Sequence, residues 1–246
     1  MLSDTWDEHC NDPHYRETLF RGIANIILSL AKMPQPRIGS FCVNDDCTIT
    51  LTNRPLLTAD VILESDGNPR SMEPGDTYTC TEPFVSDLIS LHDNPLLHDR
   101  SAADDESDCR AQMAVRAMLR TTAHHFISRE YRRGPFLLQF TDFHQSNVFV
   151  DKNWNIKCLI DLEWLCALPV ESQAVPYWLT GRSIDLLIED DLAAFDLIRQ
   201  EFMEVLDSAA SGTTLAWPIV QIMQKSWKSK AVWFWESLIS VLLGDK

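Results

Sequence analysis

The 246-residue sequence has few basic residues, few glycines, no closely paired cysteines and no long apolar run. Lys and Arg total 21 against 36 Asp and Glu, which gives a formal net charge of −15 and a sequence pI near 4.7. A protein that binds nucleic acid or an anionic membrane surface needs a surplus of basic side chains on some face. The charge balance therefore argues against both kinds of partner.

The cysteines and the chain termini argue against export and membrane insertion. Seven cysteines are scattered without a C-x-x-C pair, and the segment MLSDTWDEHC is polar and acidic, unlike a signal or transit peptide. This pattern predicts free thiols in a reducing, cytoplasmic setting. The longest apolar run near the C-terminus, residues 232–243, is about half of a membrane span and contains Glu236. We expect no transmembrane segment.

Zinc binding finds little support in the sequence. Cys42 and Cys47 flank a predicted hairpin turn, and the neighbours His124 and His125 point in different directions on a predicted helix. Structural zinc sites usually combine closely spaced ligand pairs, which these residues do not form. We therefore interpret all four residues as core or surface positions.

The first half of the chain predicts helices and one hairpin. Asp12 followed by Pro13 is a helix start, and apolar residues at helical spacing continue to Leu30 before Pro34 and Pro36 end the element. Residues 38–43 and 48–52 are β-rich runs around a polar turn, which predicts a hairpin. Residues 55–83 have no sustained period and are predicted to be mostly loop. Residues 84–92 are predicted to form a short helix.

The second half predicts a small group of strands between helices. An acidic linker, 102–108, leads into a predicted helix over 109–130 whose apolar residues can face a core. Those apolar residues are Met113, Ala117, Met118 and Phe126. Strands are predicted over 136–140, 147–150 and 156–161, and helices over 184–207 and 215–243. Without a visible boundary, residues 1–246 read as a single α+β domain that is mainly helical, with small β-hairpins.

The strands place three polar side chains that suit phosphoryl transfer. Asp142 follows the first strand, Asn147 enters the second, and Asp161 ends the third. Phosphoryl transfer uses one carboxylate to orient the acceptor hydroxyl and accept its proton, and an amide and a second carboxylate to hold Mg²⁺. An Asp and an Asn five residues apart are often a coincidence. The surrounding strand, turn and Ile-Asp ending make this pair more specific.

The segments TDFHQSNVFVD and IKCLIDLEW resemble the catalytic segment of the aminoglycoside phosphotransferase/choline-kinase group of protein-kinase-like enzymes. That group has roughly H-G-D-x-H-x-x-N-x-x-V-D followed by G-x-I-D-W-E. The similarity is greatest to the fungal branch of the family, which shares RIGSF, LTNRP and VPYWLTG. Those segments stand here at residues 37–41, 51–55 and 175–181, and the resemblance extends from about residue 15 to the end of the chain.

The resemblance implies a protein-kinase-like C-terminal lobe and a role for each matched residue. Asp142 takes the position of the catalytic base, and Asn147 and Asp161 take the two Mg²⁺-ligand positions, which also contact the ATP phosphates. His144 matches a histidine that orients the catalytic loop, and Glu163 matches a supporting acid. Phe140 stands where members of that family carry a histidine that anchors the loop. The absence of this histidine affects the expected fine positioning of the loop and not the carboxylate chemistry.

The nucleotide-binding half of a kinase is expected to be missing from this chain. Before Asp142 the only lysine is Lys32, at the end of the first predicted helix, and no two glycines there lie closer than eight residues. A phosphate-cradling loop and a strand lysine therefore cannot be identified. The chain reads as a C-terminal lobe truncated at the N-terminus, which we expect to bind Mg·ATP weakly and turn it over negligibly.

Two functions remain open at this stage. One is an ATP- and Mg²⁺-dependent phosphotransferase that acts on a small-molecule hydroxyl and whose activity requires the absent lobe or another chain. The other is a truncated, inactive kinase-like module with a binding role or none. The segment 183–207 holds eight acidic residues, which either face solvent or attract a cationic substrate. Trp227, Trp233 and Trp235 are expected to pack between helices, with a substrate pocket as the alternative. The acceptor and the oligomeric state are not readable from the sequence.

Overall fold

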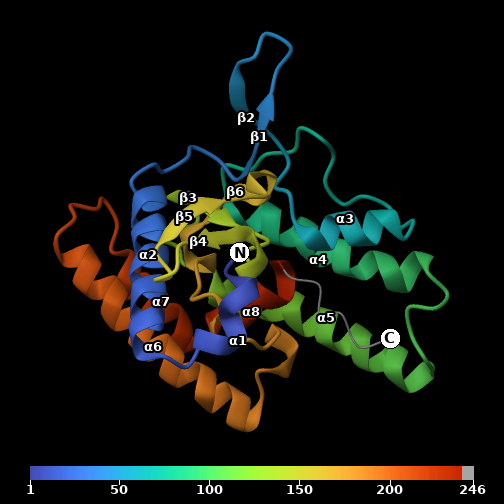
Figure 1. Cartoon of the computed structure of the whole chain (residues 1–246). Helices are drawn as coiled ribbons and strands as arrows, with labels where there is room; N and C mark the ends of the chain where they lie inside the picture. The colour runs from blue at the N-terminus through green and yellow to red at the C-terminus, as the bar shows by residue number, and fades with distance from the viewer. Residues whose placement is uncertain (240–246) are drawn as a thin grey trace.

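Helices make up most of the structure, and short strands form two antiparallel sheets (Figure 1). The structure is a computed structural model that describes residues 1–239, apart from the side chain at position 185. The helices are α1 (Trp6–His9), α2 (Pro13–Ala31), α3 (Thr58–Ser65), α4 (Thr81–His98), α5 (Glu106–Phe126), α6 (Glu189–Ser211), α7 (Ile219–Ser229) and α8 (Ala231–Ile239). The strands are β1 (Gly39–Val43), β2 (Ile49–Asn53), β3 (Phe136–Phe140), β4 (Val148–Val150), β5 (Ile156–Leu159) and β6 (Leu165–Pro169). The predicted α+β class, mainly helical with small hairpins, is confirmed.

The larger sheet separates two apolar clusters. Its strand order is β2-β1-β6-β3, and β4 pairs with β5 in a separate hairpin. Alternate side chains of β3 point to opposite sides: Leu137 joins a cluster with α2, α6 and α7, whereas Phe136 and Leu138 join one with α3, α4 and α8. We call these the α2 cluster and the α4 cluster. Figure 1 shows α2, α6 and α7 on one side of the sheet and α3, α4 and α5 on the other.

The first long helix begins and packs as its sequence predicts. The Asp12 carboxylate accepts a hydrogen bond from the backbone N–H of His14 at 2.9 Å, which caps α2, and Pro13 occupies the first turn. Gly22 lies where α2 crosses β5. A Cβ at this position would approach the Ile156 Cδ1 atom to 2.9 Å, so glycine allows the close contact between the helix and the hairpin.

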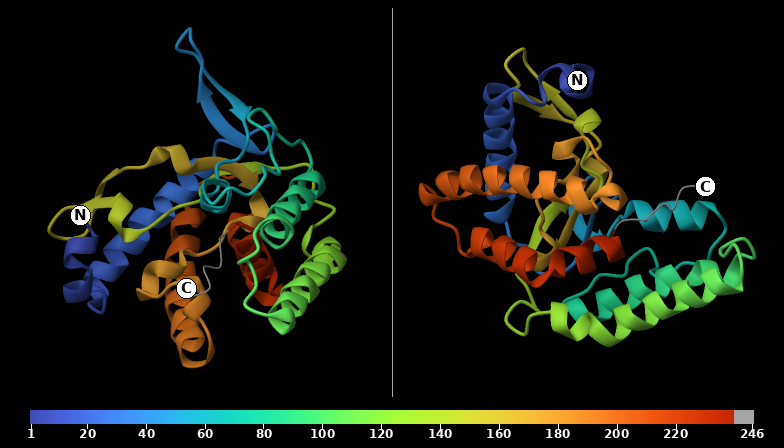
Figure 2. Two further views of the ribbon diagram at one scale, coloured as in Figure 1. Left: turned by 90° about the vertical axis from the view of Figure 1, so that its right-hand side faces the viewer. Right: turned by 90° about the horizontal axis from the view of Figure 1, so that it is seen from below.

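The predicted hairpin is also confirmed and projects from the body of the molecule. Phe41 pairs with Leu51 and Val43 with Ile49 across β1 and β2. Val43 and Ile49 are 70% and 67% exposed. Both views in Figure 2 show the main body of the chain, and the left view shows the hairpin extending away from it.

The middle of the chain contains more helix than predicted, although residues 55–83 are mostly loop as expected. The segment 55–83 contains α3, an eight-residue helix too short to show a clear period, and α4 extends over Thr81–His98 rather than 84–92. Proline is tolerated near a helix start, so Pro83 does not delay α4. Pro95 lies inside α4 without ending it.

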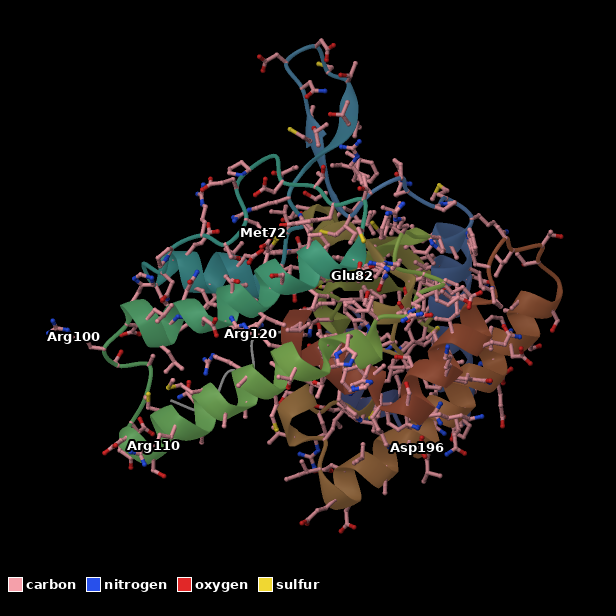
Figure 3. The ribbon with its side chains drawn as sticks, turned by 180° about the vertical axis from the view of Figure 1, so that it is seen from behind. Met72, Glu82, Arg100, Arg110, Arg120 and Asp196 are labelled. Atoms are coloured by element: carbon pink, nitrogen blue, oxygen red, sulfur yellow. The ribbon has the colours of Figure 1, made fainter. Side chains whose placement is uncertain are left out.

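The apolar face predicted for the next helix does not reach the core. α5 covers Glu106–Phe126, begins at the capping Asp105, and exposes Met113 and Met118 at 59% each. Ala117 is exposed as well, and Phe126 is half-buried against Phe234. Polar contacts attach α5 to α4 instead: Arg120 pairs with Asp93, and the Arg116 Nε–H donates to the His92 carbonyl at 2.6 Å. Figure 3 labels Arg120 in the region where α4 and α5 lie next to each other. The right view of Figure 2 shows α4 and α5 side by side.

The C-terminal part contains a break that the sequence pattern did not predict. The helix predicted over 215–243 is two helices, because Lys230 adopts a left-handed conformation (φ 65°) between α7 and α8, and residues 240–243 lie outside the described part. The helix predicted to begin at 184 begins at Glu189. Trp227 contacts Phe195 of α6, and Trp235 is buried, as the expected interhelical packing requires. No helix within residues 1–239 is long and apolar enough to cross a membrane.

Candidate active site

The loop after β3 is held at its first residue. The Thr141 N–H donates to the Trp164 carbonyl at 2.9 Å, and the Thr141 hydroxyl donates to the Leu56 carbonyl at 2.7 Å. These bonds fix the chain where it leaves the sheet, one residue before Asp142. We call residues 141–147 the Asp142 loop.

Asn147 closes the same loop from its other end. It lies in the short 3-10 helix Gln145–Asn147 and is only 7% exposed. Its side-chain Nδ2 donates to the backbone carbonyl of Asp142 at 3.3 Å, and its own carbonyl accepts from the Ile160 N–H at 3.1 Å. Asn147 therefore connects the Asp142 loop to the end of β5.

Asp161 is the residue that follows Ile160. It is exposed and adopts a left-handed backbone conformation (φ 57°, ψ 46°), which turns the chain from β5 into the 3-10 helix Leu162–Trp164. Asp is one of the residues that tolerate this conformation. The Trp164 N–H donates to the Asp161 carbonyl at 3.3 Å, and Trp164 in turn holds Thr141. Glu163 is exposed in the same 3-10 helix.

These bonds bring the predicted site residues into one region. Asp142 and Asn147 lie in one loop, and the Ile160–Asn147 hydrogen bond brings the residue before Asp161 to the end of that loop. No group of three or more His, Cys, Asp or Glu side chains within residues 1–239 is arranged to hold a metal ion. Asn147 and Asp161 are only two residues and include an asparagine, so they do not count as such a group. Their side chains offer one amide oxygen and one carboxylate.

His144 contacts the Asp142 side chain directly. Its Nε2 lies 2.9 Å from Asp142 Oδ1, and the Tyr177 hydroxyl lies 3.5 Å from the same nitrogen. A protonated Nε2 donates to the carboxylate, which then keeps its second oxygen for another partner. The sequence predicted that His144 orients the loop, and the structure places it on the carboxylate itself.

Aromatic rings support the Asp142 loop from Phe140, the last residue of β3. Phe140 stacks on Phe143 with ring centroids 5.4 Å apart, Phe143 packs edge-on against Trp178 at 5.5 Å, and Trp178 packs against Trp6 at 5.6 Å. Edge-to-face and stacked rings at these separations stabilise one another beyond the area that they bury. Phe140 thus contributes to loop packing in a different way from a histidine.

A cavity of about 530 Å³ opens beside Asp142 and His144. Its walls come from α2, from β3 and β6, from residues 172–178 and from α8, which contributes Glu236. This volume lies in the range of small-molecule sites. Asn147 and Asp161 are not among the described residues that line it.

The sequence did not reveal Tyr177, Trp178 or Glu236 as parts of this region. Tyr177 and Trp178 belong to the VPYWLTG segment, which was noted for its resemblance and given no role. Glu236 lies in the apolar C-terminal run, where a single acid could have suggested a cavity. Comparisons with family models, with curated proteins and with solved structures find no match to this chain.

Proposed function

We infer that this chain is a kinase-like phosphotransferase of the aminoglycoside phosphotransferase family, which transfers the γ-phosphoryl group of ATP to a hydroxyl of a small molecule with Mg²⁺. One observation carries this inference. Three hydrogen bonds, from Thr141 to Trp164, from Asn147 to Asp142 and from Ile160 to Asn147, hold together the segments that carry Asp142, Asn147 and Asp161. Packing alone does not require an acid and an amide at these strand ends.

Asp142 is the proposed catalytic base. Its side chain is 29% exposed and faces the cavity, so it can accept the proton of a hydroxyl bound there. His144 contacts Oδ1, which leaves Oδ2 for the acceptor hydroxyl. In phosphoryl transfer most of the rate comes from such positioning and from charge stabilisation.

Asn147 and Asp161 provide a donor set that fits Mg²⁺. Mg²⁺ prefers hard oxygen ligands and keeps several waters, so one amide oxygen and one carboxylate suffice. Because the Asn147 Nδ2 donates to the Asp142 carbonyl, the amide oxygen is the atom left to face a cation, and it already accepts from the Ser146 hydroxyl at 3.0 Å. When bound, the metal supplies neutralisation of the nucleotide phosphate charge. The free cysteines favour a reducing, cytoplasmic setting for this chemistry.

A second candidate is a kinase-like module that binds a ligand without phosphoryl transfer. It is favoured by the lining of the cavity, which includes no Lys or Arg among the described residues. Kinases neutralise nucleotide phosphates with a basic side chain as well as with metal. Lys32, the one lysine that precedes the Asp142 loop, is exposed at the end of α2.

A metal-binding experiment on the full chain tests the metal site that the first candidate requires. Mn²⁺ replaces Mg²⁺ as a paramagnetic probe, and water-proton relaxation measures its binding in the presence of the β,γ-imido analogue of ATP. We expect Asp161→Asn to weaken Mn²⁺ binding at least tenfold, because it removes the charged oxygen ligand. Asp66→Asn, at an exposed position far along the chain, is the matched control and should leave binding within twofold.

The role of Asp142 is tested by turnover once an acceptor is found, together with the lobe or chain that completes the nucleotide site. Asp142→Asn should lower kcat by about 10²- to 10⁴-fold, the usual range for loss of a general base. Mn²⁺ binding that is insensitive to Asp161→Asn, or turnover that survives Asp142→Asn, would contradict the phosphotransferase assignment.

A further inference from the structure

The cavity beside Asp142 has one polar end and a long apolar wall. α2 contributes the wall with Ile23, Ile26, Ile27 and Leu30, and the sheet adds Leu138 and Leu168. Ile26 and Leu30 are only half-buried in the free chain, so part of this wall contacts solvent. A ligand that covers the wall gains the free energy of removing apolar surface from water.

Three of the polar side chains that line the cavity already have partners within the protein. The Gln139 side chain donates to the Pro169 carbonyl at 3.0 Å, and the Ser172 hydroxyl donates to the same carbonyl at 2.8 Å. The Thr141 hydroxyl is bonded to backbone carbonyls as well. These groups offer a ligand little hydrogen bonding, which disfavours a sugar or another body with many hydroxyl and amino groups.

The charges at the cavity disfavour an anion. Asp142 and Glu236 are its acids, His144 is its one ionisable base, and no Lys or Arg lines it in the described part of the chain. The Asp142 carboxylate is occupied on one oxygen by His144 at 2.9 Å. An acceptor that carries a carboxylate of its own would be repelled by these acids.

We propose that this cavity takes an apolar alcohol without a negative charge, whose hydroxyl lies at the Asp142 end and whose hydrocarbon body lies along α2. This assignment rests on the proposed function for the role of the hydroxyl group, and it names the acceptor class of that reaction. The reaction then forms a bond between the alcohol oxygen and the γ-phosphorus of ATP and breaks the bond to the β,γ-bridging oxygen. Asp142 receives the hydroxyl proton, and ADP leaves with the electron pair.

Calorimetric titration of the full chain with 1-hexanol, 1-heptanol and 1-octanol tests the apolar wall without any turnover. Burial of one methylene strengthens binding about fourfold, so octanol should bind about fifteenfold more tightly than hexanol. Octanoate, which has the same chain length and a negative charge, should bind at least tenfold more weakly than octanol. Spermine, a polar polycation, should not displace octanol.

Two neighbouring substitutions on α2 locate the binding site. Ile26→Asp places a charge on the cavity wall and should weaken octanol binding at least tenfold. Asn25→Asp adds the same charge at an exposed position on the same helix that does not line the cavity, and should change binding less than twofold.

The results distinguish this inference from the proposed function. Equal affinities for hexanol and octanol, octanoate binding as tight as octanol, or displacement by spermine would each overturn the apolar-alcohol assignment. Mn²⁺ binding dependent on Asp161 would leave the phosphotransferase proposal standing in that case. Conversely, octanol could bind more tightly than hexanol while Mn²⁺ binding stays independent of Asp161. That result would support the cavity assignment and contradict the phosphotransferase proposal.

Discussion

At the scale of single residues, Asp60 combines burial with an incomplete set of partners. It lies in the first turn of α3 with 2% of its surface exposed, and its Oδ2 has no hydrogen-bond partner. Burial raises the pKa of this carboxyl to about 7, against the opposing effect of the Arg54 guanidinium. In the unfolded chain the carboxyl titrates near pH 4. Between pH 4 and pH 7 the folded state binds more protons than the unfolded state. Protonation of Asp60 therefore contributes to the free energy of unfolding, and this contribution is complete below about pH 4 and is lost as the pH rises through 7.

Asp60→Asn should therefore change the pH dependence of stability. We expect the variant to exceed the parent in free energy of unfolding by about 1–3 kcal/mol at pH 8, and the difference to shrink toward pH 5. Urea denaturation at pH 5, 6, 7 and 8 measures this. Burial also raises the pKa of Glu171 to about 7, but Glu171 is present in both proteins and cancels in the difference. The exposed Asp66→Asn is the control, and a difference independent of pH would contradict the assignment to Asp60.

Residues close in sequence were predictable at the candidate site, and distant ones were not. Asp142, Asn147 and Asp161 could be placed together because each borders a strand of one short segment. The contact between His144 and Tyr177 spans 33 residues of sequence and depends on how the 175–181 segment folds back. The stacking of Phe140 on Phe143 could not be predicted either, because a phenylalanine in the sequence does not indicate which ring it contacts.

At the scale of elements, the prediction succeeded where local signals agree. The capping Asp12, Pro13 and an apolar period over five turns define α2, and the polar turn between two β-rich runs defines the β1–β2 hairpin. α3 has eight residues and no side-chain cap, so no local signal identifies it. For α5 the helix itself was predictable, but its orientation depends on α4 and α8, which meet it through Arg116, Arg120 and Phe126.

The orientation of α5 predicts unequal effects at two adjacent residues. Met118 is 59% exposed, whereas Leu119 packs against the α4 cluster. Met118→Ala should change the free energy of unfolding by less than about 0.5 kcal/mol, and Leu119→Ala should lower it by about 2 kcal/mol. Met, Leu and Ala are all strong helix formers, so a difference in helix propensity does not explain a difference in stability between the two variants. Urea denaturation provides the comparison, and a larger loss at Met118 would indicate that another surface covers this face of α5.

At the scale of the whole molecule, the two apolar clusters share one strand. Leu137 belongs to the α2 cluster, and its neighbours Phe136 and Leu138 belong to the α4 cluster. β3 pairs with β6 over five residues, and the Asp142 loop continues directly from β3. Loss of either cluster therefore exposes one face of the strand that carries the candidate base, and we expect the chain to unfold as one unit.

Phe202→Ala tests this coupling between the clusters. Phe202 is fully buried in the α2 cluster and packs edge-on against Phe20 at a centroid separation of 5.5 Å. Its truncation should lower the free energy of unfolding by about 3–5 kcal/mol. The hydrogen-exchange protection of amides that exchange only through global unfolding then falls a few hundred- to a few thousand-fold. The slowest amides of α2 and α4 should lose protection by the same factor, because both exchange only when β3 is released.

Phe84→Ala, at a fully buried position of the α4 cluster, is the matched variant and should affect both helices equally as well. If Phe202→Ala reduced protection in α2 and left α4 unchanged, the chain would consist of two independently unfolding units, and the Asp142 loop would depend on the α2 cluster alone.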